Sequence, residues 1–192
     1  MLERLGVLGG TFDPVHVGHL AAATAARHHL ELTRVLLVVA GDPWQKHGEV
    51  VAPAEARYEM VVAAIDGAEG LEASRLEIDR PGLTYTIDTI EALRSPDREL
   101  FLIVGADVAA RIDTWDRVDQ LRDAVTLAIV GREDAPATPP PDGWHAISVP
   151  MPRIDVSSTS LRRRIAEGAP VEFLIPLPAV RVLRAHDLYT AR

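Results

Sequence analysis

The chain has 192 residues and a formal net charge of −8 at pH 7, and it contains no cysteine. Binding to a nucleic-acid backbone depends on an excess of cations, so this charge argues against DNA or RNA as a partner. The absence of cysteine excludes disulfides, thiolate zinc sites and cysteine nucleophiles. The hydrophobic fraction of 47% and the charged fraction of 25% are typical of a globular protein, and we expect one domain over residues 1–192.

The apolar segments also argue against a membrane protein. The longest of them, such as residues 35–40, have the length of a strand and cannot cross a bilayer. No charged segment followed by a long apolar stretch opens the chain, so we expect no secretory signal and a cytoplasmic location. Lys46 is the only lysine, which is a weak indication that a lysine is required at this position.

Strands and helices alternate along the chain. Apolar runs that are typical of buried parallel strands occupy residues 5–8, 35–40, 100–104, 125–130 and 146–149. Helical patterns occupy residues 21–30, the segments after Pro53 and Thr84, two short pieces before Arg122, and residues 158–167 and 178–186. The alternation predicts a doubly wound α/β fold with a parallel sheet, which binds ligands beyond the carboxyl ends of its strands.

Two local expectations complete this description of the fold. In the helix after Pro53, the helical spacing of Tyr58, Val61, Val62 and Ile65 predicts the face that packs inward. Residues 71–78 are expected to be extended, and Thr84 is expected to cap the helix that follows it.

The most distinctive segment is Gly9-Gly10-Thr11-Phe12-Asp13-Pro14-Val15-His16-Val17-Gly18-His19-Leu20, between the first strand and the first helix. Glycine has no Cβ, so a ligand can approach this backbone closely. The two histidines lie three residues apart near the helix start, where unpaired amides attract anions. The segment has neither the G-x-G-x-x-G pattern nor a P-loop. It predicts a phosphate site, in preference to an ordinary tight turn with two surface histidines.

A metal site is the other interpretation of His16 and His19. Zinc takes three or four protein ligands, and no third ligand of a suitable type lies nearby in the sequence. We therefore expect no metal held by protein residues here.

A second candidate phosphate site is Val156-Ser157-Ser158-Thr159-Ser160-Leu161-Arg162, at the start of a predicted helix. Hydroxyl groups and free amides at a helix start can donate to phosphate oxygens, and Arg162 can add a bidentate cation. A plain helix cap followed by a solvated basic face is the alternative. That alternative suits Arg163 and Arg164. It is weaker for Ser157, Ser158 and Thr159, because one capping residue would suffice.

These segments resemble known signatures. Residues 9–20 resemble the G-G-T-F-D-P-x-H-x-G-H-L signature of the H-x-G-H nucleotidyltransferase superfamily, and residues 156–162 resemble its second signature, [IV]-S-S-T-x-[ILV]-R. Three further segments resemble those of bacterial nicotinate-nucleotide adenylyltransferases: Leu83-Thr84-Tyr85-Thr86-Ile87-Asp88-Thr89, Val104-Gly105-Ala106-Asp107 followed by Trp115, and Pro43 with Lys46. Phe173 and Leu174 before Ile175-Pro176 depart from the family pattern, which has a tyrosine there.

The resemblance implies a Rossmann-like fold and adenylyl transfer from ATP to nicotinate mononucleotide, giving deamido-NAD and pyrophosphate in NAD biosynthesis. It implies Mg²⁺ bound mainly through the ATP phosphates. Implied catalytic residues are His16, His19, Lys46 and Arg162. Implied ATP contacts are Gly9, Gly10, Thr11, Phe12, His16, His19, Asp107, Ser157, Ser158, Thr159 and Arg162. Implied nicotinate-mononucleotide contacts are Thr11, Lys46, Thr84, Tyr85, Thr86, Gly105, Asp107 and Trp115.

The residues implied to bind nicotinate mononucleotide have less support from the sequence than the two phosphate segments. A helix start at Thr84, Tyr85 and Thr86 would favour a carboxylate, and Trp115 would stack on a cationic pyridinium ring. Taken alone, Tyr85 fits a helix staple and Trp115 fits a core residue. Transfer to nicotinamide mononucleotide or to phosphopantetheine, cytidylyl transfer, and a nucleotide-binding regulator without turnover are the alternative functions. The sequence leaves a homo-oligomer open.

Overall fold

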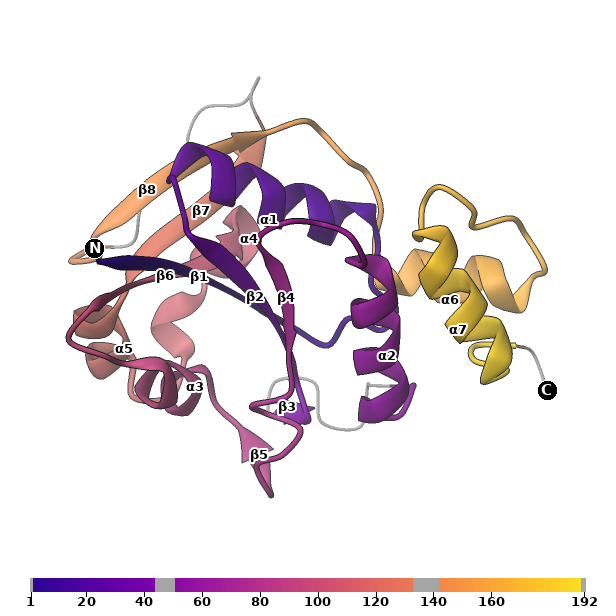
Figure 1. Cartoon of the computed structure of the whole chain (residues 1–192), viewed down its shortest axis with the longest axis horizontal. Helices are drawn as coiled ribbons and strands as arrows, with labels where there is room; N and C mark the ends of the chain where they lie inside the picture. The colour runs from indigo at the N-terminus through magenta and orange to yellow at the C-terminus, as the bar shows by residue number, and fades with distance from the viewer. Residues whose placement is uncertain (1, 44–50, 133–141, 191–192) are drawn as a thin grey trace. The chain divides into compact units, whose positions relative to one another are not determined.

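The structure, a computed structural model, describes residues 2–43, 51–132 and 142–190 (Figure 1). The strands are β1 Glu3–Gly10, β2 Arg34–Val39, β3 Asp42–Pro43, β4 Leu71–Ser74, β5 Leu83–Thr84, β6 Arg98–Gly105, β7 Thr126–Arg132 and β8 Ala146–Met151. The helices are α1 Val17–His29, α2 Ala54–Ala64, α3 Thr86–Leu93, α4 Ala106–Ala109, the 3-10 helix η2 Ile112–Thr114, α5 Val118–Ala124, α6 Ser158–Ala166 and α7 Leu177–Ala185.

The predicted parallel sheet is confirmed. Six strands form it in the order β4-β2-β1-β6-β7-β8. The pairs β1·β6, β6·β7 and β7·β8 are parallel, with Val7 opposite Leu102 and Ala128 opposite Ile147. The strands β3 and β5, which the sequence did not predict, form a separate parallel pair. Such two-residue strands have no periodicity of their own to detect.

The chain divides into two compact units. The first contains Met1–Gly9, Ala21–Leu36 and Tyr85–Arg153, and the second contains Gly10–Leu20, Leu37–Thr84 and Ile154–Arg192. In the first unit, α3 packs against α5, as Figure 1 shows. The middle of β6 and the middle of β7 are almost fully buried, as expected for apolar runs covered on both faces.

In the second unit, α2 packs against α7 (Figure 1). The predicted inward face of α2 is partly wrong. Val61 and Ile65 are buried as predicted, but Val62 is 44% exposed. Within the helix, the buried stripe contains Arg57, Met60 and Val61. These three buried residues keep the helical spacing of i, i+3 and i+4, so the true stripe runs through a charged residue. Because Arg57 is charged, a search for apolar residues alone could not assign it to the buried face.

The predicted cap at Thr84 is also wrong. Thr84 lies in β5, with its Cα opposite that of Pro43, and α3 begins only at Thr86, with Tyr85 in the N-cap position. Pairing with β3 holds Thr84 in an extended conformation, so it cannot cap the helix. Residues 71–78 are extended only in part, since β4 ends at Ser74. No helix in the described ranges is both long enough and apolar enough to span a membrane.

Candidate active site

The predicted site residues fall in both units. The second unit contains the two signature segments, with Gly10, Thr11, Phe12, His16, His19, Ser157, Ser158, Thr159 and Arg162, and also Thr84. The first unit contains Gly9, Tyr85, Thr86, Gly105, Asp107 and Trp115. Lys46 lies outside the described residues. The prediction of one shared cleft beyond the strand ends stays a prediction.

His16 and His19 lie face to face at the start of α1. Their ring centroids are 3.7 Å apart with an interplanar angle of 25°, and Phe12 contacts His19 edge-on at 4.9 Å. The His16 amide donates to Nδ1 of His19 at 3.2 Å. Because that nitrogen accepts, a neutral His19 carries its proton on Nε2. The motif therefore fixes both the orientation and the tautomer of His19.

His16 is buried, with 7% of its surface exposed. Burial lowers its pKa from 6.5 to about 4, because an imidazolium is costly to remove from water. At neutral pH His16 is therefore uncharged, and it can offer an N–H group but no positive charge. Its Nδ1 is buried and has no hydrogen-bond partner among the described residues. An orphaned ring nitrogen in this position is the kind of group that a bound ligand satisfies.

Gly18 makes the stacked arrangement possible. A Cβ at this position would lie 3.1 Å from two atoms of the His16 ring and 3.3 Å from Val156. The hydrogen atom of glycine leaves room for the ring and for the second signature segment at the same point.

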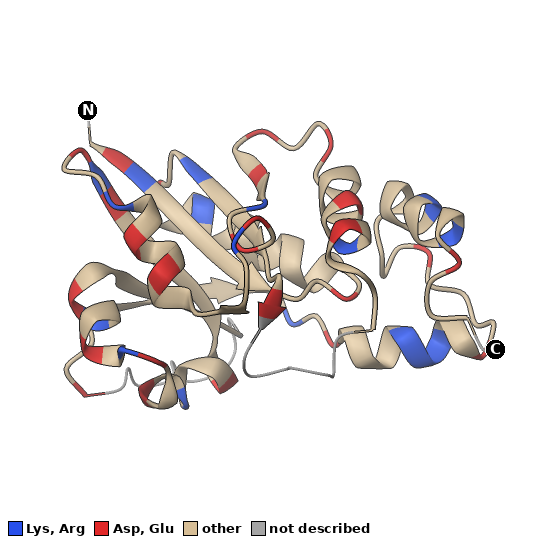
Figure 2. Ribbon diagram, turned by 90° about the horizontal axis from the view of Figure 1, so that it is seen from below, with Lys and Arg blue, Asp and Glu red and all other residues tan. Residues whose placement is uncertain are grey.

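The second signature segment forms the start of α6. Ser157 is its N-cap, and its Oγ accepts from the Ser160 amide at 3.2 Å in a capping box. Ser158 donates its hydroxyl hydrogen to the Pro14 carbonyl at 2.9 Å, which joins this helix start to the first segment. The box satisfies one of the orphan amides of the first turn and leaves those of Ser158 and Thr159 directed out of the helix start. The arginines of α6 follow directly (Figure 2).

Arg162 and Asp13 form the second link between the two segments. Nη1 of Arg162 donates to the Asp13 carbonyl at 2.7 Å and lies 3.5 Å from the carboxylate. Nη2 lies 3.4 Å from Oγ1 of Thr159. The structure thus brings the two predicted phosphate segments together through Ser158 and Arg162.

Arg57 was not predicted as a site residue, and it contacts the first signature segment through the Thr11 carbonyl. Arg57 is 1% exposed, and burial lowers its pKa while the nearby Asp13 raises it. Its guanidinium donates to the carbonyls of Ala52, Thr11 and Gly41 at 3.0, 2.7 and 3.2 Å. A charged residue in the apolar stripe of α2 was the signal that could have found it.

The predicted acceptor residues have fewer local contacts. Thr84 is 4% exposed, and its hydroxyl has no partner among the described residues. No side chain caps the start of α3 at Tyr85 and Thr86. Asp107 is exposed on the short helix α4, after Gly105 in its N-cap position, and Trp115 is half-buried.

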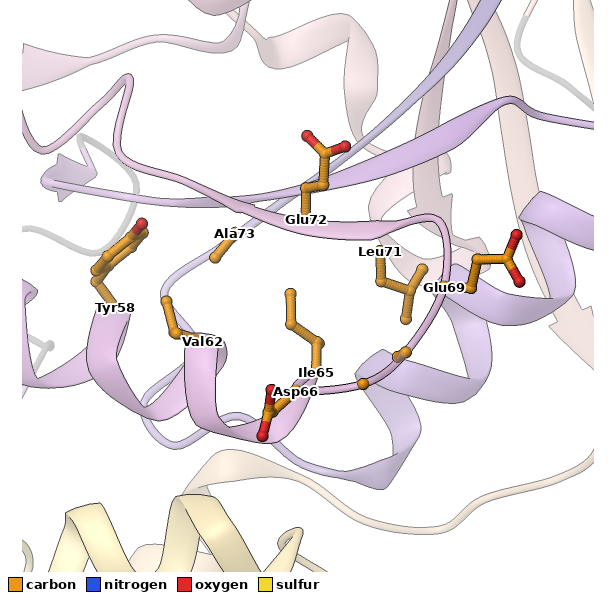
Figure 3. A pocket seen from close by; sticks show the side chains of 10 residues that line it. Tyr58, Val62, Ile65, Asp66, Glu69, Leu71, Glu72 and Ala73 are labelled. Carbon is orange, nitrogen blue, oxygen red and sulfur yellow. The ribbon is translucent and has the colours of Figure 1, made fainter.

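A hollow of about 640 Å³ lies between α2 and β4, and none of the predicted site residues in the described part of the chain lines it. Figure 3 shows Val62 of α2 and Ile65, just after this helix, together with Leu71 and Ala73 of β4 in its lining. The described lining is mostly apolar apart from Asp66, Glu69 and Glu72, and it includes no cation for a phosphate. This lining therefore does not suit a phosphate group.

The described ranges contain no group of three or more histidine, aspartate or glutamate residues that could hold a metal ion. The donor set at the histidine pair and α6, which consists of amides, hydroxyls, imidazoles and a guanidinium, suits phosphate oxygens better than a cation.

The class of this protein follows from a comparison with known families. The family model described as "Cytidylyltransferase-like" matches residues 7–164, which include both signature segments.

Curated relatives are similar over nearly the full chain. A "Probable nicotinate-nucleotide adenylyltransferase" of Thermus thermophilus is 42% identical over 188 residues, covering 97% of this chain and 99% of its own length. A protein of the same description from Nocardioides sp. is 45% identical, covering 95% of this chain and 92% of its own length. The chain belongs to the family of nicotinate-nucleotide adenylyltransferases.

Solved structures support the same fold. Plasmodium falciparum nicotinic acid mononucleotide adenylyltransferase complexed with NaAD has a TM-score of 0.80 at 16% identity, and each chain is covered to 97%. The same enzyme complexed with APC has a TM-score of 0.78 at 15% identity.

Proposed function

We propose that this protein transfers the adenylyl group of ATP to nicotinate mononucleotide, giving deamido-NAD and pyrophosphate in NAD biosynthesis. The observation that carries the proposal is the junction of the two signature segments, in which Ser158 and Arg162 join α6 to the loop that leads to the stacked histidines. Family membership at 41–45% identity over nearly the full chain supports the same reaction.

The reaction needs alignment more than it needs a base. An oxygen of the acceptor's phosphate forms a bond to the α-phosphorus of ATP, and the bond from that phosphorus to the bridging oxygen breaks, releasing pyrophosphate. The second pKa of such a phosphate is about 6, so the nucleophile is already ionised at neutral pH. The protein must hold two anions in line and stabilise the charge that develops on the transferred and leaving groups.

The described residues can supply this stabilisation. We assign to His16 and His19 N–H donation to the α-phosphate and leaving group, with His19 nearest the reacting atoms. The uncharged His16 acts by hydrogen bonding, consistent with its lowered pKa. The start of α6 and Arg162 take the β- and γ-phosphates, through amides and a guanidinium. Lys46, outside the described residues, is assigned a further phosphate contact.

Mg²⁺ enters with the substrate in this proposal, coordinated mainly by the ATP phosphates and by water, as is usual for a hard cation that dehydrates reluctantly. The protein supplies the donors around the complex. Chelation should stop turnover, and added Mg²⁺ should restore it.

For the acceptor, we propose that the start of α3 and the hydroxyl of Thr84 bind the nicotinate carboxylate. A helix start without a side-chain cap favours a carboxylate over a neutral carboxamide. Trp115 offers an indole face to the cationic pyridinium, a contact that contributes about 0.5–2 kcal/mol. Asp107 accepts from a ribose hydroxyl or a nucleotide amine in this assignment.

One assay tests the function. Purified protein with Mg·ATP should release pyrophosphate when nicotinate mononucleotide is present, and more slowly with nicotinamide mononucleotide. Trp115→Ala should raise the KM for nicotinate mononucleotide about tenfold and leave that for ATP unchanged. Release with phosphopantetheine alone, or binding of ATP without any turnover, would contradict the proposal and favour another family activity or a regulator.

We further propose that residues 1–192 act as one domain in the cytoplasm, without nucleic acid as a partner. The net charge of −8 supports the last point. The assay mixture can be run through a sizing column to decide whether the active species is a homo-oligomer.

A further inference from the structure

Asp13 lies at a junction of four segments of the second unit. Asp13 is only 2% exposed. Oδ1 accepts from the Ala52 amide at 3.1 Å and from the Tyr189 hydroxyl at 2.6 Å. Oδ2 accepts from the Val51 amide at 2.9 Å and lies 3.5 Å from Nη1 of Arg162. Donors from α6, from the segment before α2 and from the segment after α7 thus meet on one carboxylate.

Arg162 lies beside this carboxylate but does not form the paired hydrogen bonds of a bidentate contact with it. Its Nη1 makes its short hydrogen bond, 2.7 Å, with the Asp13 carbonyl. An arginine and a carboxylate ordinarily prefer two parallel hydrogen bonds, and that arrangement would use up the guanidinium donors. Two amides and the Tyr189 hydroxyl already occupy most of the acceptor positions of the carboxylate. The remaining donors of Arg162 can therefore serve another anion.

Tyr189 reaches Asp13 because the backbone after α7 is sharply turned. Its φ is +62°, and that of Asp187 is +48°, both in the left-handed region that residues with a Cβ rarely adopt. The Leu188 amide donates to the Leu183 carbonyl at 3.1 Å, and the Thr190 hydroxyl donates to the Asp187 carbonyl at 3.2 Å. These contacts hold the turn and aim the tyrosine at Asp13.

The Tyr189 hydroxyl donates to the Asp13 carboxylate at 2.6 Å, which is the length of a charge-assisted hydrogen bond. Burial and the neighbouring Asp13 carboxylate both raise the pKa of Tyr189 above the ordinary value. Both effects favour the protonated hydroxyl, which is the form that can donate.

We propose that Tyr189 is a positioning residue for adenylyl transfer, whose hydroxyl occupies Oδ1 of Asp13 and so keeps Arg162 available to the phosphates of ATP. This inference rests on the proposed function, and Tyr189 acts through Asp13 and Arg162 rather than on the reacting atoms. When the hydroxyl is removed, the buried carboxylate has one donor fewer and draws Arg162 onto itself. ATP then binds less tightly, while the acceptor nucleotide is unaffected.

Tyr189→Phe tests this role, because it removes the hydroxyl and keeps the ring. We expect calorimetric titration with Mg·ATP to give an affinity about tenfold weaker than that of the unaltered protein. The KM for nicotinate mononucleotide should change less than twofold. In a chain that also carries Arg162→Lys, the additional Tyr189→Phe change should alter the ATP affinity less than twofold, because the residue through which the hydroxyl acts is already gone.

Tyr58→Phe is the matched control, since Tyr58 is a half-buried tyrosine on α2 whose ring contacts Arg75. It should leave both affinities unchanged. An unaltered ATP affinity in Tyr189→Phe, an equal loss with and without Arg162→Lys, or a Tyr189→Phe protein that fails to fold would each overturn the assignment. If the unaltered protein releases no pyrophosphate, the proposed function fails, while the ATP titration still decides the role of Tyr189.

Discussion

The helices α3 and α6 both begin after residues that carry hydroxyl groups, but the chain uses those groups in different ways. At α6, Ser157 and Ser160 form a capping box and Ser158 is tied to Pro14. At α3, no side chain caps the helix, and the Thr84 hydroxyl just before it is buried without a partner in the described part of the chain. The protein itself completes the start of α6, whereas the start of α3 has no side-chain cap.

The largest expected effect concerns His19, in the segment that Ser158 and Arg162 of α6 join through Pro14 and Asp13. His19→Ala removes an N–H donor whose tautomer is set by the His16 amide. We expect kcat to fall about 10²–10³-fold, as when one preorganised donor is lost from a transition state. Pyrophosphate release measures the rate, and circular dichroism should show an intact fold. The control is His29→Ala, an exposed histidine at the other end of α1; a rate for His19→Ala within tenfold of the control would contradict the assignment.

The second effect is on stability and depends on pH. The pKa of His16 is about 4 in the folded protein, against 6.5 ordinarily, so below pH 6.5 the unfolded chain binds a proton that the folded chain does not. Stability should therefore fall as the pH drops from 6.5 to 4, by roughly 3 kcal/mol over the whole window. Urea unfolding at several pH values measures this. His16→Asn should remove this part of the pH dependence. If the unaltered protein and His16→Asn have identical profiles of stability against pH, the burial of His16 does not cause the pH dependence.

The third effect concerns Thr84, just before the uncapped start of α3. Thr84→Val replaces a buried hydroxyl that has no described partner with a methyl group of similar shape. The free protein should be as stable as before or more stable by about 1 kcal/mol, and the KM for nicotinate mononucleotide should rise about tenfold. Thr24→Val, at an exposed position on α1, serves as the control. A clear loss of stability with an unchanged KM would mean that the hydroxyl serves the fold, and the contrast between the helix starts would disappear.

The smallest effect concerns the capped start of α6, where we expect a change in stability and none in the KM for nicotinate mononucleotide. Ser157→Ala removes the N-cap of α6 and should cost about 1 kcal/mol of stability, which is about 2–4 °C in Tm for a chain of this size. The KM for nicotinate mononucleotide should stay the same. Thermal unfolding beside Ser148→Ala, an exposed serine on β8, gives the comparison. A Tm equal to that of the control would show that the capping box contributes little.

The sequence predicted most of the sheet, because a strand covered on both faces is a continuous apolar run. It did not predict β3 and β5, which exist only because two distant segments meet. For the same reason Thr84 was mistaken for a helix cap, since its extended conformation depends on Pro43.

The two predicted phosphate segments could be recognised from local spacing, but the buried residues that contact them could not. Asp13 was visible only as part of a motif, and its partner Tyr189 lies 176 residues further along the chain. No local pattern connects residues at that separation. Arg57 was detectable in principle, because it interrupts an apolar stripe that the rest of α2 maintains.

Gly18 has a consequence for how this active site can vary between related chains. A side chain there would press on the His16 ring and on Val156 at once, so it would disturb the histidine stack and its contact with the second segment together. A substitution at position 18 would therefore require the His16 ring and Val156 to move together. The spacing of the motif thus reflects a limit on volume as well as a set of predicted chemical roles.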